Sequence, residues 1–344
     1  MSFAKYKKRA SEQIDAAYRY GNYRLYDRGR NSLNCQFICS DGLRKSCDEH
    51  FKAGHPFGPI GRPDKFPHHS GNCLYVKTDF LSEFATRTLA RIDQPFVLVT
   101  GSSDFGLASR FVRTDTVEQI LAHPHLTAWY AQNCDYRHPR LHPMPIGLDY
   151  HTLSSRFRYQ SWGYFSTPLQ QEAALNGVRL AAPDLTDKSV SAYCNWHHVL
   201  NRGDRLACIN GVELEVMKLE EPAARRDRSW KNNAQHFYTL SPLGNGLDCH
   251  RTWEALLLGS VPIVGASALS GLFANLPVCV VDDWRLVTRS YLEENRQRIL
   301  QSEFDFAPLY LSYWQSLFRG EETQPSRVQS FQEFIRTAHD QPMD

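Results

Sequence analysis

Short apolar runs alternate with amphipathic stretches along most of the chain, and this alternation predicts an α/β protein. The clearest apolar run, PFVLVT at 95–100, lies between stretches of helical spacing at 79–92 and 116–122. A run without polar interruption is typical of a central parallel strand that is covered on both faces. Further strands are predicted at 74–76, 127–130, 189–194, 237–240, 278–281 and from about 261. We expect a doubly wound, Rossmann-like sheet in each half of the chain.

This pattern divides the chain into four segments. Residues 1–70 are predicted to be an N-terminal extension with a helix at 4–20 and a Gly- and Pro-rich loop region after it. Residues 71–180 and 181–300 are predicted to be the two α/β domains, joined by a linker near 176–188. Residues 301–344 are predicted to form helices that pack back on the first domain. A polar stretch at 213–221 is also predicted to be helical.

Composition and charge exclude several classes of protein. The chain has 344 residues, of which 42% are hydrophobic and 22% charged, and its net charge is +2. These values are typical of a globular protein and give no overall field that would attract nucleic acid. No apolar run approaches the length of a membrane-spanning helix, so we expect a soluble cytoplasmic protein. Lys7, Lys8 and Arg9 are expected to form a solvated face of the N-terminal helix, and peripheral contact with a membrane is the alternative. An odd count of nine scattered cysteines favours reduced thiols.

The most informative stretch is FYTLSPLGNGLDCHRTWEALLLGSVPIV at 237–264. It is predicted to form a strand, a turn with Gly244 and Gly246, and then a helix. This order directs free backbone N–H groups and the positive end of the helix dipole at one point. Such a point suits an anion, for example phosphate. Arg251 and Glu254 lie three residues apart on that helix, where they would serve a diphosphate and a ribose. An ordinary glycine turn and a simple Arg251–Glu254 salt bridge are the alternatives.

Polar residues at other predicted strand ends are further candidates. GSSD at 101–104 follows a central strand, where ligands bind in open α/β sheets, although Ser and Asp also suit a helix N-cap. The loop at 131–153 carries histidines and prolines, and loops of this length are usually functional. Arg202 and Arg205 follow the strand at 189–194, where they would clamp phosphates or form surface salt bridges. Asp282 and Asp283 are interpreted as a strand-end cap rather than as metal ligands.

Four segments together carry a family resemblance. They resemble segments of the exostosin-like (family 47-type) glycosyltransferases, which have the GT-B fold. The segments are SPLGNGLDCHRTWEALLLGSVPIV at 241–264, AQN at 131–133, PIGLDYHT at 145–152 and VVDDW at 280–284. The resemblance covers about residues 72–320. It implies two facing Rossmann-like domains and transfer of a sugar, with inversion, from a nucleotide sugar to a hydroxyl of a glycan or glycolipid. The donor would be a UDP-sugar in preference to a GDP-sugar, and neither a metal nor another cofactor would be obligatory.

The resemblance also assigns residues. The donor segment corresponds to Ser241, Gly244, Asn245, Gly246, His250, Arg251 and Glu254, with Arg205 as a second phosphate contact. The general base is expected from the first domain. Asp104 is the first choice and Asp149 the second, followed by His123 and His142. Ser103 and Asn133 are expected to bind the acceptor. A different nucleotide-sugar enzyme such as an epimerase, or a non-catalytic carbohydrate-binding protein, remains an alternative.

Overall fold

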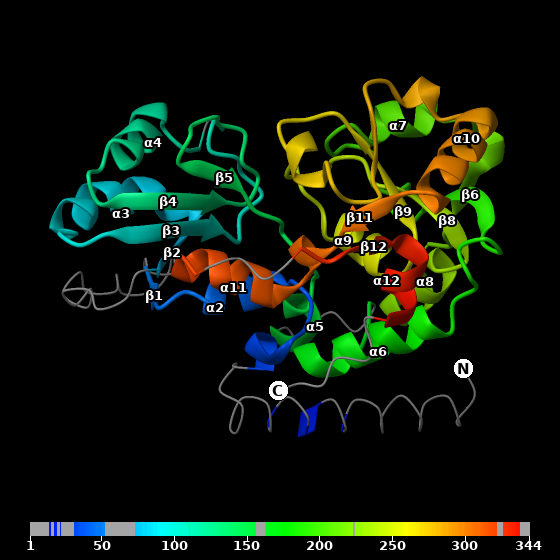
Figure 1. The fold of residues 1–344 in the computed structure, drawn as a ribbon, viewed down its shortest axis with the longest axis horizontal. Helices are drawn as coiled ribbons and strands as arrows, with labels where there is room; N and C mark the ends of the chain where they lie inside the picture. Colours follow the sequence, from blue (N-terminus) through cyan, green and yellow to red (C-terminus); the bar gives the residue numbers. More distant parts are fainter. Residues whose placement is uncertain are drawn as a thin grey trace.

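The computed structural model describes residues 14, 17–18, 21, 31–51, 73–109, 111–155, 162–222, 224–321 and 326–337. These residues form two lobes, each built on a five-stranded parallel sheet with helices packed against it (Figure 1). The predicted α/β class is therefore confirmed. We call residues 31–155 the first lobe and residues 189–300 the second lobe. The predicted helix at 4–20 falls almost entirely outside the described residues.

The sheet of the first lobe has its strands in the same order in space as in the sequence. It consists of β1 (Glu49–His50), β2 (Cys73–Lys77), β3 (Phe96–Gly101), β4 (Leu126–Ala131) and β5 (Leu141–Pro143), all parallel. A doubly wound sheet needs a reversal of strand order, and the described strands of this sheet have none. The prediction of a doubly wound first domain is therefore wrong. The central strand β3 is buried at every position, as its uninterrupted apolar sequence predicts.

The first lobe begins earlier in the chain than predicted. Residues 31–51, assigned above to an extension, contribute the edge strand β1 and the core residues Phe37 and Ile38, both fully buried. The helices of this lobe are α2 (Ser40–Lys45), α3 (Leu81–Arg87), α4 (Thr114–Leu121) and α5 (His151–Ser155), with the short 3-10 turns η2 (Asn31–Asn34), η4 (Thr78–Phe80) and η5 (Leu89–Arg91). Of these, α2 and α3 contact the sheet directly. The tract before residue 52 lacks strong periodicity because much of it is loop, so its place in the core was not predicted.

The sheet of the second lobe is doubly wound, as predicted. Its strands are β6 (Ser189–Cys194), β7 (Met217–Leu219), β8 (His236–Leu240), β9 (Val261–Gly265) and β10 (Cys279–Val281), in the spatial order β10-β9-β8-β6-β7. The chain moves outward from β6 to β7 and then returns to the other side of β6, so strand order reverses between β6 and β8. Residues 213–221, predicted to be helical, instead form the 3-10 turn η6 (Leu214–Val216) and the edge strand β7.

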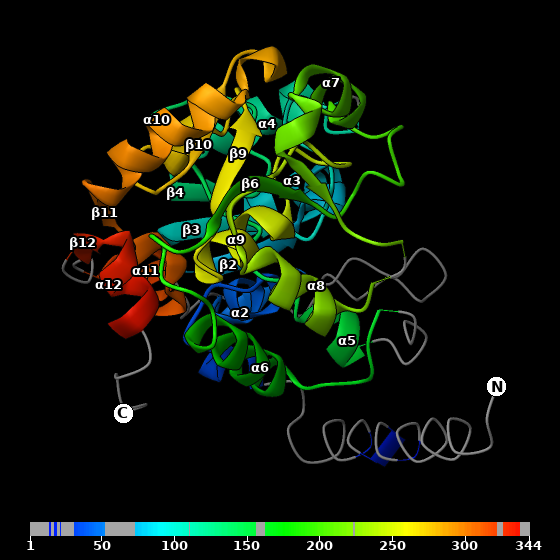
Figure 2. The same ribbon diagram turned by 90° about the vertical axis from the view of Figure 1, so that its right-hand side faces the viewer.

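Helices cover both faces of this second sheet (Figure 2). They are α7 (Arg205–Gly211), α8 (Arg226–Asn233), α9 (His250–Leu257) and α10 (Arg289–Leu300), with the 3-10 turns η7 (Ser270–Phe273) and η8 (Trp284–Leu286). Within the parts of the chain that are described, every helix is too short or too polar to span a lipid bilayer.

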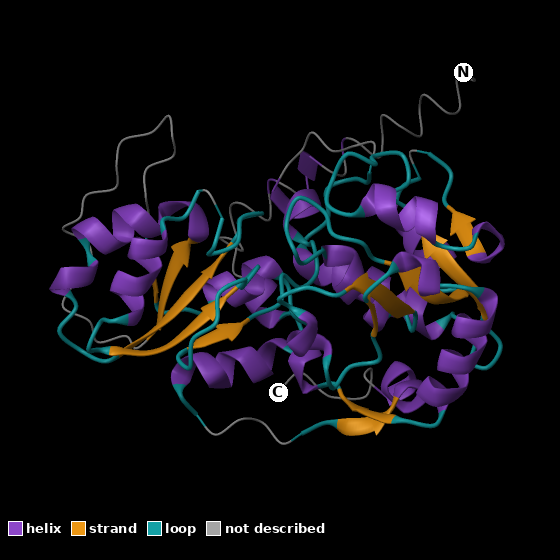
Figure 3. Cartoon of the chain, turned by 90° about the horizontal axis from the view of Figure 1, so that it is seen from above, coloured by secondary structure: helices purple, strands orange, loops and turns teal. Residues whose placement is uncertain are grey.

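Segments outside the two sheets connect the lobes. Helix α6 (Pro168–Leu180) starts at a capping box between Thr167 and Gln170 and continues into the region predicted to be a linker. After the second lobe come β11 (Glu303–Asp305), η9 (Ala307–Leu309), α11 (Leu311–Arg319), β12 (Val328–Ser330) and α12 (Phe331–Thr337). The antiparallel pair β11–β12 lies apart from both large sheets (Figure 3). Helix α11 returns to the first lobe, where Trp314 and Phe318 pack against Tyr130.

Candidate functional site

The reversal of strand order in the second lobe locates a cavity. In doubly wound sheets the loops that leave the carboxyl ends of the two strands at the reversal diverge and leave a crevice, where ligands bind. Here these are the loops after β6 and β8. A cavity of about 550 Å³ lies at this position and is lined by residues of both loops, with Asp104 and Ile146 contributed by the first lobe. We call it the first cavity.

Two arginines face the first cavity with unsatisfied hydrogen-bond donors. Buried Nε of Arg205, and buried Nε and Nη2 of Arg251, have no hydrogen-bond partner among the described residues. Nη1 of Arg205 donates a hydrogen bond to the carbonyl oxygen of Val199, at 3.0 Å. Neither arginine forms an ion pair with any described carboxylate. Burial, reinforced by the charge of Arg251, lowers the pKa of Arg205 to about 10. The site thus holds two cations that a multivalent anion would neutralise.

Glu254 lines the same cavity but does not pair with Arg251. Its Oε1 accepts a 2.7 Å hydrogen bond from Nη2 of Arg226, and both side chains are largely buried. Arg226 also donates to Oε1 of Gln171 at 2.7 Å, and its guanidinium lies 4.6 Å from the ring centroid of Trp230. The alternative of an intrahelical Arg251–Glu254 salt bridge is therefore excluded. The pairing of Arg226 with Glu254 was not predicted, because the two residues are 28 positions apart in the sequence.

The glycine turn before α9 is closely packed. A Cβ atom on Gly244 would lie 3.0 Å from Sγ of Cys249, and one on Gly246 would lie 2.7 Å from Nδ2 of Asn133 in the other lobe. Both positions line the first cavity, so their backbone forms part of its wall. Asn245 also lines it, and its Nδ2 donates to Oδ2 of Asp104 at 3.1 Å.

Ser241 occupies a different environment from the one predicted. Its side chain is buried, its hydroxyl is 2.7 Å from Oγ1 of Thr252, and it is not among the residues that line the first cavity. It therefore fixes the start of α9 to the end of β8 rather than facing a ligand.

A second cavity, of about 630 Å³, lies on the side of the first lobe. It is lined by residues after β2 and β3, including Lys77, Asp79 and the predicted Ser103, whose Oγ donates to Oδ1 of Asp79. Asp104, Ile146 and His250 line both cavities. The two cavities therefore adjoin, and the exposed carboxylate of Asp104 lies where they meet.

Asn133 differs from the prediction that it binds an acceptor. It is 1% exposed and is absent from the lining of both cavities. Its Nδ2 donates to the carbonyl oxygen of Ser103 at 2.9 Å, and its Oδ1 accepts from the backbone N–H of Asp248 at 2.8 Å. Both polar atoms of the amide are therefore used, one within the first lobe and one between the lobes, and we assign Asn133 a positioning role instead.

Asp248 stands out in the sequence only as one of several polar residues at the start of the helix, and it was given no role there. Its Oδ2 accepts from the backbone N–H of Ile146 at 2.6 Å, and both carboxylate oxygens lie 2.9 Å from Nε1 of Trp253. Burial raises its pKa to about 6. The acidic residue directly before the helix could have been recognised in the sequence as a candidate for a structural role. Only the structure shows that it fastens α9 to the first lobe.

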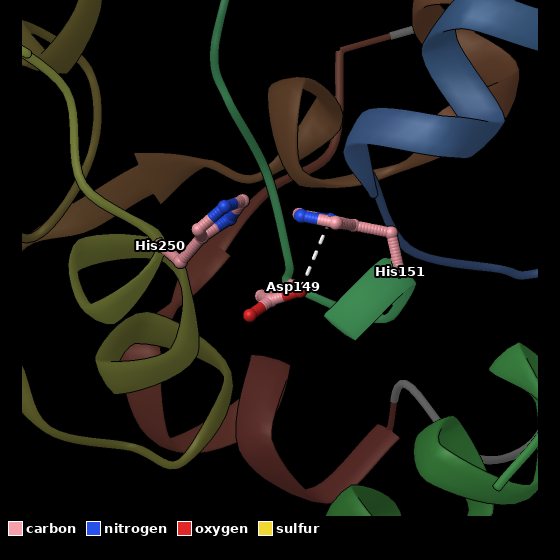
Figure 4. A group of neighbouring side chains, drawn as sticks. All are labelled: Asp149, His151 and His250. Carbon is pink, nitrogen blue, oxygen red and sulfur yellow. Dashed lines mark ion pairs between the residues drawn. The ribbon is translucent and has the colours of Figure 1, made fainter. Parts of the chain in front are cut away.

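Asp149, His151 and His250 converge at the boundary between the lobes (Figure 4). Oδ1 of Asp149 is 3.0 Å from Nδ1 of His151 and accepts from the backbone N–H of Thr152 at 3.0 Å. Burial raises the pKa of Asp149, but the neighbouring His250, His151 and Arg226 lower it more, so the net pKa is below the usual value. Nδ1 of His250 is 2.6 Å from the carbonyl oxygen of Gly147, and burial lowers the pKa of this histidine.

The other predicted candidates lie elsewhere. Asp149 itself lines neither cavity, whereas His151 lines the second. His123 packs against Phe96, and His142 packs against Tyr130, and neither histidine lines either cavity. Asp283 accepts from the backbone N–H of Arg285 at the start of η8, which confirms that it is a cap.

Comparison with models of protein families found no match, and comparison with curated proteins found none either.

Proposed function

We propose that this protein is a GT-B glycosyltransferase that moves a sugar from a nucleotide sugar, a UDP-sugar in preference to a GDP-sugar, to a hydroxyl of a glycan or glycolipid. The observation that carries the proposal is the pair of unneutralised arginines, Arg205 and Arg251, in a cavity at the strand-order reversal of a doubly wound sheet. A buried and a half-buried cation beside the start of a helix favour a ligand with two or more negative charges. The diphosphate of a nucleotide sugar has this charge.

The remaining walls of the first cavity fit the rest of a nucleotide. Glu254 offers a buried carboxylate that Arg226 keeps in one orientation, and a carboxylate accepts hydrogen bonds from the two hydroxyls of a ribose. Gly244 and Gly246 line the first cavity and carry no side chain, so a phosphate there would lie next to the backbone. Arg205, Arg251 and the N-terminus of α9 would stabilise the charge that develops on the leaving diphosphate.

The second cavity supports transfer to an acceptor rather than binding of a nucleotide alone. It adjoins the first cavity at Asp104, so an acceptor hydroxyl there would approach the anomeric carbon from the side of the first lobe. Asp104 is the candidate general base, because its exposed carboxylate faces the junction. Attack from the side opposite the diphosphate would invert the anomeric configuration. Ser103, which also lines this cavity, would contact the acceptor.

Thermal stabilisation of the purified protein by UDP, GDP and NAD⁺ tests this proposal. We expect UDP to raise the melting temperature most and NAD⁺ to have no effect, since a ligand that binds only the folded state raises stability by mass action. A panel of UDP- and GDP-sugars, assayed for slow hydrolysis, would then identify the sugar. Stabilisation by NAD⁺ would favour the epimerase alternative. No response to any nucleotide would overturn the proposal and favour a carbohydrate-binding protein.

A further inference from the structure

We propose that Asp149, His151 and His250 form a binding site for one divalent transition-metal ion, with Zn²⁺ as the representative ion, at the boundary between the two lobes. Asp149 and His151 come from the start of α5 in the first lobe, and His250 is the first residue of α9 in the second. The cluster contains neither arginine, although His250 also lines the first cavity.

The three side chains already lie close to coordination geometry. Their ligand atoms are all within 4.8 Å of one another, and Asp149 and His151 approach to 3.0 Å. Zn²⁺ bonds of about 2.0–2.2 Å in a tetrahedral arrangement separate ligand atoms by roughly 3.4 Å. Small side-chain rotations would therefore suffice. In Figure 4 the two imidazole rings extend toward each other from opposite lobes, with the carboxylate beside them.

The hydrogen bond of His250 fixes which of its nitrogens is available to a metal. The carbonyl oxygen of Gly147 can only accept, so Nδ1 of His250, 2.6 Å away, carries the proton. The lone pair is therefore on Nε2. A metal-ligating histidine usually donates its other ring N–H to a carbonyl or a carboxylate in this way.

The type and number of ligands indicate the class of metal. Two imidazoles and one carboxylate suit Zn²⁺, Co²⁺, Ni²⁺ or Fe²⁺, whereas Mg²⁺ and Ca²⁺ prefer all-oxygen sites. Three protein ligands leave a fourth position for water or substrate. His151 and His250 both line the second cavity, so this position would be accessible from it.

A metal held by ligands from both lobes has a mechanical consequence. It would link α5 to α9 and hold the two lobes in the arrangement seen here. If the lobes moved apart, neither lobe alone would supply all three ligands. Metal binding should therefore stabilise the arrangement in which the lobes are in contact. This inference does not depend on the proposed function, since metal binding can be measured without nucleotide or acceptor.

Calorimetric titration and thermal melting of the full chain test the inference. The protein, free of affinity tags and treated with a chelator that is then removed by dialysis, is titrated with Zn²⁺. We expect one high-affinity ion per chain and a higher melting temperature. Co²⁺ in place of Zn²⁺ should give the visible absorption bands of a four-coordinate site with nitrogen and oxygen ligands.

Variants distinguish this site from adventitious binding by other histidines. His151→Ala and His250→Ala should each weaken Zn²⁺ binding by at least tenfold and abolish the thermal shift. His198→Ala is the matched control, because His198 lines the first cavity outside the cluster, and it should bind Zn²⁺ as the wild type does. The inference is overturned if the wild type binds no Zn²⁺ at micromolar concentrations, or if both cluster variants bind Zn²⁺ as tightly as the control. In either case the cluster is only the Asp149–His151 ion pair with His250 beside it.

Discussion

The side-chain oxygen of Asn133 in the first lobe accepts a 2.8 Å hydrogen bond from the backbone N–H of Asp248 in the second. The carboxylate of Asp248 in turn accepts from the backbone N–H of Ile146 in the first lobe. Gly246 packs against the same Asn133 amide, where a larger residue would collide. These contacts fasten the glycine turn and the start of α9 to the first lobe, so the two cavities share a rigid boundary.

Replacement of Asn133 should therefore reduce stability rather than acceptor affinity. Asn133→Ala removes one hydrogen bond within the first lobe, to Ser103, and one between the lobes, from Asp248, and it places an alanine at φ 52°. We expect a loss of about 3 kcal/mol in the free energy of unfolding, measured by urea denaturation. Asn133→Gly should lose less, because glycine adopts a positive φ without strain. Wild-type stability combined with a raised acceptor KM would instead restore the original prediction of an acceptor contact.

Arg251→Ala should abolish transfer and weaken nucleotide binding while leaving the fold intact. Loss of a charge-assisted contact to phosphate costs about 1.5–3 kcal/mol, or roughly ten- to a hundredfold in the dissociation constant of UDP. Without nucleotide, the variant should melt at or above the wild-type temperature. The reason is that Nε and Nη2 of Arg251 have no partner to lose and that repulsion of Arg205 is relieved.

The control for this variant is Arg285→Ala. Arg285 is exposed, pairs with Asp283 and does not line the first cavity, so its removal should leave UDP binding unchanged. Retained turnover in Arg251→Ala, or an equal loss of UDP affinity in both variants, would contradict the assignment of Arg251 to the diphosphate.

Asp104→Asn should separate donor binding from transfer. Asparagine keeps an oxygen that can accept from Asn245, so the local structure and the affinity for UDP should persist. It cannot remove the proton of an acceptor hydroxyl, and we expect the rate of transfer to fall by about 10²–10⁴-fold. Donor affinity is measured by calorimetry and transfer with a matched acceptor. If transfer survives, Asp149, acting through His151, becomes the candidate base.

Glu172 predicts a pH dependence of stability. Burial raises the pKa of its carboxyl group to about 7, although the backbone N–H groups of Gln36 and Phe37 donate to it and lower the pKa. Between pH 4.5, the ordinary pKa of the group, and about pH 7, the folded protein retains a proton that the unfolded chain has released. The contribution of Glu172 to stability is therefore greatest below pH 4.5 and falls as the pH rises to 7.

Urea denaturation of the wild type and Glu172→Gln between pH 4.5 and 8 measures this contribution. Glutamine does not titrate, so the difference in unfolding free energy between the two proteins should shift against the wild type as the pH rises through the window. Taking the difference removes the similar trend expected from Asp248, whose pKa is also raised. A difference that does not change with pH would show that Glu172 titrates normally.

Local features of the fold were predictable because they depend on residues that are close in sequence. The apolar run at 95–100 could be recognised as a buried strand, and the strand, turn and helix from 237 to 257 were all found where the pattern indicated. The edge strand β7 was missed because three residues at the side of a sheet carry too little periodicity to outweigh a polar, helix-compatible context. The absence of a reversal in the first sheet was missed for another reason, since alternation of strands and helices does not specify strand order.

The sequence by itself determined the α/β class, the glycine turn and the presence of Arg251 and Glu254 at the start of one helix. Only the tertiary structure decided the partners of these residues. It pairs Glu254 with Arg226, places Arg251 near Arg205 with no carboxylate partner among the described residues, and brings His250 next to Asp149 and His151, about a hundred positions away. The physical reason is that hydrophobic periodicity encodes which face of an element is buried, whereas contacts between lobes depend on strand order and on how the sheets meet.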